Sequence, residues 1–156
     1  MIKRLSSIPL LLMLLLGCKK GPRECCVSFD IGMRIAVQSP SKLDLLDPQS
    51  SKFNYENIDI FDKTSSGYVR VFNGSMDQPK RFGVFQHPTT GKYELKLGLN
   101  INMIGGVSET LIKFDNNVPD TIRAVIVKNG GNTTVSKVTI GSATFLPTEL
   151  YTFIKD

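Results

Sequence analysis

Carboxylates are the residues of this sequence whose spacing could support chemistry. Asp59 and Asp62 lie three residues apart near the end of an apolar segment, and Asp44 and Asp47 flank a Leu-Leu dipeptide. Two carboxyl groups that converge in one cleft can hydrolyse glycans or peptides by acid–base catalysis. These residues and the loop Asp115-Asn116-Asn117 also have a structural interpretation, because Asp and Asn side chains in loops usually bind their own backbone and form turns.

Histidine and cysteine offer little further chemistry. His87 is the only histidine and precedes Pro88-Thr89-Thr90-Gly91, which predicts a position in a hairpin turn and excludes metal sites built on two imidazoles. For the adjacent Cys25 and Cys26, three interpretations remain open: buried reduced thiols, a strained vicinal disulfide, or intermolecular pairing. The sequence has no nucleophile elbow, no phosphate-binding loop and no EF-hand spacing. We therefore expect no catalytic residue, no metal and no cofactor.

The N-terminus carries a hydrophobic segment that ends at a cysteine. The apolar stretch over residues 8–16 is about half as long as the 20 or so residues of a spanning helix, which predicts a helical secretory signal. The sequence Leu15-Leu16-Gly17-Cys18 resembles the lipobox of bacterial lipoproteins, with a leucine where a small residue is usual. This resemblance implies that residues 1–17 are cleaved after Gly17 and that the Cys18 thiol is acylated. Residues 18–25 then form a lipidated tether.

Length and charge limit what the mature chain can be. After cleavage, 139 residues remain, with 17 basic and 14 acidic side chains, which fits one mildly basic domain. Lys19, Lys20 and Arg23 adjoin the lipid, where cations reinforce contact with an anionic bilayer surface. No basic stripe alternates with aromatic residues, so we expect no nucleic-acid partner.

Period-two alternation of apolar and polar residues dominates the rest of the chain. It predicts two long strands, over residues 27–37 and 93–103. Shorter strands are expected over residues 58–61, 68–72, 82–86, 110–114, 121–128, 134–140 and 151–154. Residues typical of hairpin turns occur at Asn73-Gly74, at Thr89-Thr90-Gly91 and at Asn129-Gly130-Gly131-Asn132. We predict an all-β fold over residues 26–156, a single antiparallel β-sandwich of immunoglobulin-like or prealbumin-like type, with a closed barrel as the alternative.

Four short motifs of the mature sequence occur in a particular order. They are Cys18, Asp44-Leu45-Leu46-Asp47-Pro48, Asp120-Thr121-Ile122 and Lys137-Val138-Thr139-Ile140. This set resembles small lipoproteins of the Bacteroidota, and the resemblance implies a β-sandwich rather than any activity. The motif Asp120-Thr121-Ile122 also resembles the O-glycosylation site of exported proteins in that group, and this resemblance implies a glycan on Thr121. The alternative is that Thr121 only begins a strand.

Together these features predict a membrane-anchored envelope lipoprotein that binds or scaffolds an envelope protein or glycan without catalysis. A carboxylate-based hydrolase of glycans or peptides is one alternative, and a subunit of a cell-surface assembly that uses β-strand addition is another. Basic residues follow Cys18 where some lipoproteins of the Bacteroidota carry an acidic surface-export signal. The tether of roughly eight residues spans at most about 29 Å. Both features favour the periplasmic face of the outer membrane over the cell surface.

Overall fold

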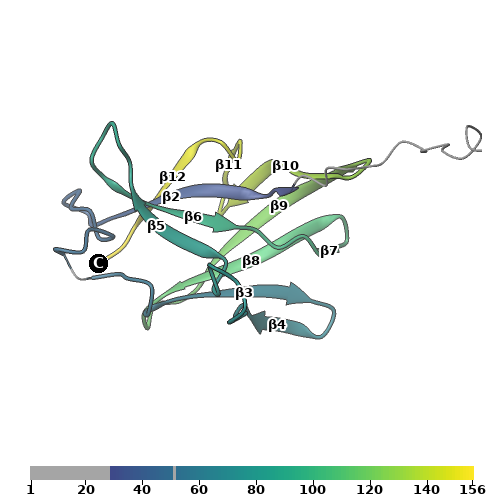
Figure 1. Ribbon diagram of the computed structural model, residues 1–156, viewed down its shortest axis with the longest axis horizontal. Helices are drawn as coiled ribbons and strands as arrows, with labels where there is room; N and C mark the ends of the chain where they lie inside the picture. The colour runs from purple at the N-terminus through teal and green to yellow at the C-terminus, as the bar shows by residue number, and fades with distance from the viewer. Residues whose placement is uncertain (1–28, 51) are drawn as a thin grey trace, which may run out of the picture.

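Alternating apolar residues form two facing β-sheets. The computed structural model describes residues 29–50 and 52–156, and in this part the chain consists of strands, turns and loops without a helix (Figure 1). In chain order the strands are β1 (Phe29–Asp30), β2 (Gly32–Gln38), β3 (Ile58–Thr64), β4 (Gly67–Arg70), β5 (Phe82–Gln86), β6 (Tyr93–Gly98), β7 (Met103–Ile104), β8 (Val107–Phe114), β9 (Asp120–Asn129), β10 (Asn132–Ile140), β11 (Ala143–Phe145) and β12 (Leu150–Ile154). The predicted all-β sandwich is confirmed.

Each sheet pairs strands from distant parts of the sequence. Sheet A has the order β1-β10-β9-β8-β3-β4, with β11 beside β10 and β7 beside β8, and sheet B has the order β12-β2-β6-β5. Most neighbouring strands are antiparallel, as predicted, but β1 pairs with β10 and β12 pairs with β2 in parallel. The strand predicted over residues 27–37 is divided at Ile31, where the chain changes sheet. β1 lies at one edge of sheet A, and β2 lies inside sheet B.

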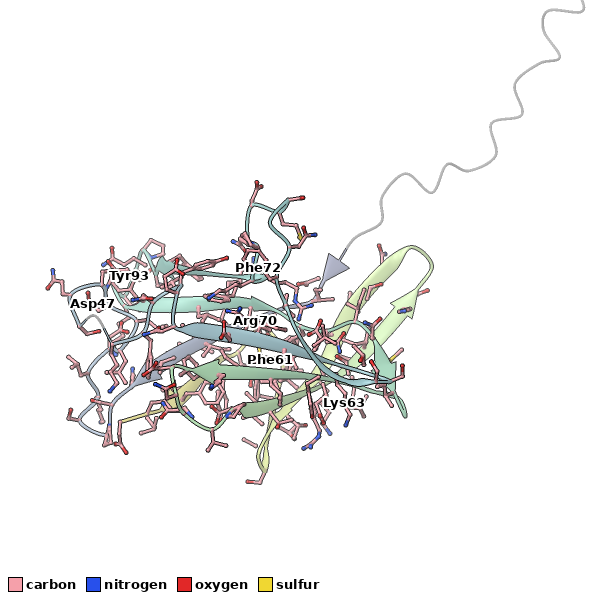
Figure 2. The ribbon with its side chains drawn as sticks, turned by 90° about the horizontal axis from the view of Figure 1, so that it is seen from below. Asp47, Phe61, Lys63, Arg70, Phe72 and Tyr93 are labelled. Atoms are coloured by element: carbon pink, nitrogen blue, oxygen red, sulfur yellow. The ribbon has the colours of Figure 1, made fainter. Side chains whose placement is uncertain are left out.

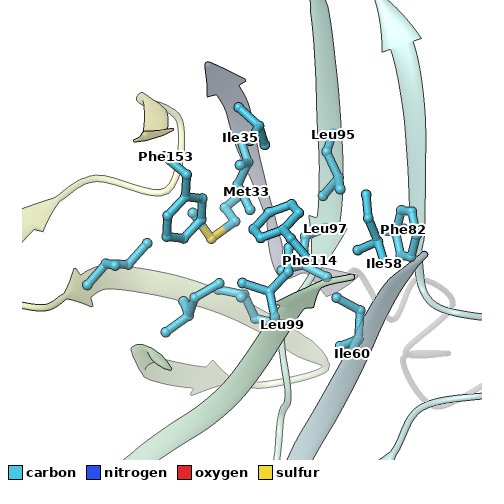
Figure 3. Close-up of a cluster of buried hydrophobic side chains, with 14 of the residues drawn as sticks. Met33, Ile35, Ile58, Ile60, Phe82, Leu95, Leu97, Leu99, Phe114 and Phe153 are labelled. Carbon is cyan, nitrogen blue, oxygen red and sulfur yellow. The ribbon is translucent and has the colours of Figure 1, made fainter. Parts of the chain in front are cut away.

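The hydrophobic core lies between the facing sheets. The predicted alternation is confirmed in β2, where Met33, Ile35 and Val37 are buried, and in β6, where Leu95 and Leu97 are buried. Side chains at every second position of a strand share one face, so each strand contributes its apolar set to the same core. The other residues labelled in the core of Figure 3 are Ile58, Ile60, Phe82, Leu99, Phe114 and Phe153.

The second long strand of the prediction is wrong in its C-terminal half. β6 ends at Gly98, and the chain then crosses to sheet A, where β7 begins at Met103. Asn100 explains the crossing, because it is 1% exposed and its side-chain amide donates hydrogen bonds to the carbonyl oxygens of Lys63 and Glu109 at 2.9 and 3.2 Å. A buried asparagine needs such partners. The apolar alternation therefore continues through a loop that joins the two sheets.

Two of the three expected hairpin turns are confirmed. The β5–β6 turn contains Gly91 with a φ of 68°, and the β9–β10 turn contains Gly130 with a φ of 57°, a region that glycine adopts without a steric penalty. The turn at Asn73-Gly74 does not join a hairpin, because β4 and β5 belong to different sheets.

Part of the sequence-based prediction falls outside the described residues. This applies to the start of the strand expected over residues 27–37, to Gly17 and Cys18, and to the pair Cys25 and Cys26. Within residues 29–50 and 52–156, no helix is long and apolar enough to cross a membrane.

Candidate functional site

The structure does not bring Asp59 and Asp62 together. Both lie on β3, and because three positions separate them, their side chains project from opposite faces of the strand. Asp59 accepts hydrogen bonds of 3.1 and 2.6 Å from Arg70 on the outer face of sheet A. Asp62 accepts two hydrogen bonds of 2.7 and 2.6 Å from the guanidinium of Arg81. Each carboxylate is thus neutralised by its own arginine.

Asp44 and His87 do line one pocket, on the outer face of sheet B. The pocket has a volume of about 380 Å³ and is also lined by Arg34 and Glu94. Asp44 accepts hydrogen bonds from the backbone amides of Leu46 and Tyr93 at 3.0 and 2.8 Å. These bonds occupy both oxygens of its carboxylate.

Glu94, Arg34 and His87 in this sheet B pocket are engaged as well, whereas the side chains of Gln38, Lys92 and Thr152 have no partner among the described residues. Glu94 is 3% exposed and receives two hydrogen bonds from Arg34, at 2.7 and 2.9 Å. This contact raises the pKa of the Arg34 guanidinium. The Nδ1 atom of His87 accepts the amides of Thr89 and Thr90 at 3.3 and 3.4 Å, in the turn where the sequence placed it. The hydrogen bonds of Asp44 and His87 in this pocket therefore hold the surrounding loops in place.

Asp47 and Asp115 confirm the structural interpretation of the acidic loops. Asp47 accepts the amide of Gln49 at 2.8 Å and forms a turn with it. Asp115 has a φ of 50°, in the left-handed region that Asp and Asn tolerate better than most residues. The amide of Asn117 donates to the carbonyl oxygen of Phe114 at 3.0 Å, which closes a tight turn after β8.

A second concave site lies on the outer face of sheet A. It has a volume of about 520 Å³, within the range of small-molecule sites, and crosses β4, β3 and β8 before it reaches the loop after β8. We call it the sheet A groove and define it by Phe61, Tyr68, Leu111, Lys113 and residues 116–119. Phe61 lies opposite Leu111 on β8 and opposite Arg70 on β4. In Figure 2, Phe61 and Arg70 mark this face of the sheet.

Most polar side chains of the sheet A groove are unengaged, whereas most of those in the sheet B pocket are bonded within the protein. The side chains of Lys113, Asn116 and Asn117 form no hydrogen bond or ion pair with any described residue. They surround a floor in which Phe61 and Leu111 are only partly buried. An apolar floor edged by a few polar groups is typical of ligand sites. These three side chains can therefore bind a ligand without first breaking contacts within the protein.

A buried carboxylate holds Tyr68 at the side of the groove. Glu109 is 8% exposed and accepts hydrogen bonds from the Tyr68 hydroxyl, from Lys63 Nζ at 3.3 Å and from Arg123 Nε at 2.9 Å. Burial alone would raise the pKa of Glu109, but the bonds from Tyr68 and Lys63 and the charge of Arg123 outweigh it, so this pKa is lowered. The bond to Glu109 also raises the pKa of Tyr68. The tyrosine ring is thereby fixed in one position.

Protonation of Glu109 is expected to destabilise the fold at acid pH. Because its pKa is lower in the folded protein, the ionised group stabilises the fold above the unfolded-state pKa of about 4.3. This stabilisation is lost as the pH falls through the folded-state value. Glu109→Gln should cost about 1–3 kcal/mol at neutral pH and flatten the acid side of the stability curve, measured by urea unfolding from about pH 7 to about pH 3.

Asp59 provides the comparison for this experiment. Burial would raise its pKa, but hydrogen bonding to Arg70 and the charges of Arg70 and Lys80 lower it overall. Asp59 should therefore leave some pH dependence in the Glu109→Gln protein. If the stability of Glu109→Gln fell as steeply toward acid pH as that of the unsubstituted protein, Glu109 would not be the group that causes the acid destabilisation.

Thr121, the predicted O-glycosylation site, lies on β9 beside the groove. It is partly buried and lies opposite Leu111 in the strand register. It also lines an open pocket with Asp120, whose carboxylate lies 2.6 Å from Lys155 Nζ. Burial and the Asp120 charge raise the pKa of Tyr151 in the same pocket. Glycosylation of Thr121 remains a prediction.

Sequence reasoning identified only part of this site. It drew attention to Asn116 and Asn117 but not to Phe61, Tyr68 or Lys113. These three lie on different strands, and only the strand order brings them to one face. Across the residues that the structure describes, no three His, Cys, Asp or Glu side chains gather as a metal-ligand set. No family model, curated protein or solved structure matches this chain.

Proposed function

We propose that this protein is a lipid-anchored binding module of the bacterial envelope, and that its sheet A groove binds an acidic saccharide. The lipobox-like sequence ending at Cys18 supports the anchor and export. The observation that carries the binding function is the set of unengaged polar groups, Lys113, Asn116 and Asn117, beside an apolar floor. The carboxylates considered for hydrolysis are held by arginines or by backbone amides instead.

The residue types in the groove favour a saccharide over other small ligands. A sugar ring has an apolar C–H face, which can pack on Phe61 and Leu111, and a rim of hydroxyl groups that need both donors and acceptors. Each of the two asparagine amides offers both. Lys113 adds a single positive charge, which favours a sugar that carries a carboxylate.

Binding to envelope polysaccharide tests this proposal. The probe is polysaccharide extracted from the host envelope, used before and after its carboxyl groups are reduced to alcohols. Lys113→Ala should weaken binding of the untreated polysaccharide about ten- to hundredfold, because a charge-assisted hydrogen bond contributes about 1.5–3 kcal/mol. Asn116→Ala should weaken binding of both forms by a smaller factor. Calorimetric titration gives the affinities.

The control separates the groove from the general basicity of the chain. Lys128 is an exposed lysine on β9 without a partner among the described residues, so Lys128→Ala removes the same charge outside the groove. This variant should bind as the unsubstituted protein does. Equal losses in Lys113→Ala and Lys128→Ala, or equal losses for the native and the reduced polysaccharide, would contradict the proposed site.

A further inference from the structure

β4 forms a free edge of sheet A. Among the described residues it pairs only with β3, and all of its residues are exposed. The amide of Val71 donates to the carbonyl oxygen of Ile60 at 2.8 Å, which continues the β3–β4 ladder past the end of β4. In an antiparallel pair, alternate residues bond to the neighbouring strand. Tyr68 and Arg70 therefore direct their backbone amide and carbonyl groups away from the sheet.

This edge is only four residues long, but it lacks the lysines, prolines and bulges that usually prevent sheets from joining. The only charged side chain of β4 is Arg70, and its guanidinium binds Asp59. Large apolar side chains are exposed along the edge and the chain that follows it: Val69 is 53% exposed, Phe72 64% and Met76 53%. An edge with these properties can accept an additional strand. Figure 2 shows Arg70 and Phe72 on this side of the molecule.

We propose that β4 pairs with β4 of a second copy of this chain, antiparallel and centred on Val69. In this register Val69 lies opposite Val69 of the second copy, and Tyr68 lies opposite Arg70 in both directions. The outward-facing backbone groups of Tyr68 and Arg70 then bond to each other in the pattern of an antiparallel ladder. Such a contact uses the same patch on both copies, so it closes as a twofold dimer.

The charges of the strand select this register and this partner. A pair centred on Arg70 would place two like charges directly opposite each other, which destabilises a cross-strand pair. Centring on Val69 keeps the two guanidinium groups apart, so each Arg70 can retain its hydrogen bonds to Asp59. This register therefore pairs the strand with itself without placing like charges together. Valine against valine at the centre buries the most exposed apolar residue of β4.

Cysteine cross-linking of the full-length chain in its membrane tests the dimer. Val69→Cys is introduced together with Cys25→Ser and Cys26→Ser, while Cys18 is retained for the anchor. Residues facing each other at a non-hydrogen-bonded antiparallel position have Cα atoms about 4.5 Å apart, within the range of a disulfide. Mild oxidation should convert most of the Val69→Cys protein to a covalent dimer on a non-reducing gel.

Met76→Cys is the matched control, because Met76 is as exposed as Val69 but lies in the loop after β4. It should remain monomeric, as should the parent protein without an introduced cysteine. Equal cross-linking of both variants would indicate random collision and overturn the proposal. Absence of the Val69→Cys dimer, or its replacement by a disulfide to another protein, would also overturn it.

Val69→Lys gives an independent measurement. A lysine at the centre of the seam places two like charges together, so the detergent-solubilised protein should change from dimer to monomer by light scattering. Its circular dichroism spectrum should not change, since Val69 is exposed in the single chain and the fold of each copy is retained. An unsubstituted protein that is monomeric by the same measurement would contradict the dimer.

Discussion

Replacing Lys80 by methionine is expected to lower the free energy of unfolding by about 3–5 kcal/mol. Lys80 is 4% exposed, and its Nζ atom donates hydrogen bonds to the carbonyl oxygens of Tyr55, Glu56 and Ile58 at 2.8, 3.0 and 3.1 Å. It also lies 3.4 Å from the Asp59 carboxylate. One ammonium group thus donates hydrogen bonds to three backbone carbonyl oxygens of the segment that leads into β3. Methionine has a similar length but no donor, so it deprives all three carbonyl oxygens of this partner, including the buried one of Ile58.

Urea unfolding followed by circular dichroism measures this loss, since the sequence contains no tryptophan for fluorescence. Lys128→Met is the matched control: it makes the same change at an exposed position without a partner and should shift stability by less than about 0.5 kcal/mol. If the two variants were equally stable, the buried ammonium would not hold this loop.

Replacing Cys18 by alanine is expected to abolish acylation of the protein completely, and the lipid anchor is lost with it. The thiol of Cys18 is the predicted attachment point, and alanine offers no nucleophile in its place. Incorporation of a clickable palmitate analogue should fall to background. Cleavage after Gly17 should also fail, so that the precursor with residues 1–17 accumulates.

Cys25→Ser is the matched control for the anchor. It removes a thiol only seven positions away, and it should leave palmitate labelling and cleavage unchanged. Labelling that persists in Cys18→Ala, or that disappears in Cys25→Ser, would place the lipid elsewhere. The measurement is independent of the groove and of the β4 edge, so its outcome bears on the anchor alone.

The strands could be predicted because their alternation reflects a two-faced sheet. The range 82–86 matches β5 at both ends, and the strand expected over 134–140 lies within β10. The pattern fails after Gly98 because Leu99 remains buried while the chain leaves sheet B. An apolar residue that enters the core from a loop looks the same in the sequence as one that enters it from a strand.

The candidate site was harder to predict than the strands, because it depends on neighbours across strands. Asp59 and Asp62 are close in the sequence, but the twofold repeat of a strand places them on opposite faces. Phe61, Leu111 and Tyr68 are far apart in the sequence and meet only because β3 lies between β8 and β4. Spacing along the chain does not determine strand order, and the groove follows from that order.

The two sides of the sheet A groove differ in rigidity, and this difference affects the entropy of ligand binding. Glu109 holds the Tyr68 hydroxyl, and Lys63 Nζ lies 5.8 Å from the centre of the Tyr68 ring. The aromatic side of the groove is therefore already in place, and a ligand loses less entropy on binding when the site is preorganised. The unengaged side chains of Lys113 and Asn116 lie on the opposite side and can adjust to the ligand.

The change of sheet at Ile31 determines how the domain would respond to mechanical force. A pull on the chain before β1 first loads the two-residue pairing of β1 with β10. It then loads β2, which is bonded to β12 from Arg34 to Gln38 and to β6 from Gly32 to Ile35. Tension along β2 loads both ladders in shear, so many hydrogen bonds must break together rather than one after another. Forced unfolding is governed by the unfolding rate. In the proposed lipid-anchored protein, a ligand held in the groove would then pull against the anchor while the sandwich stays folded.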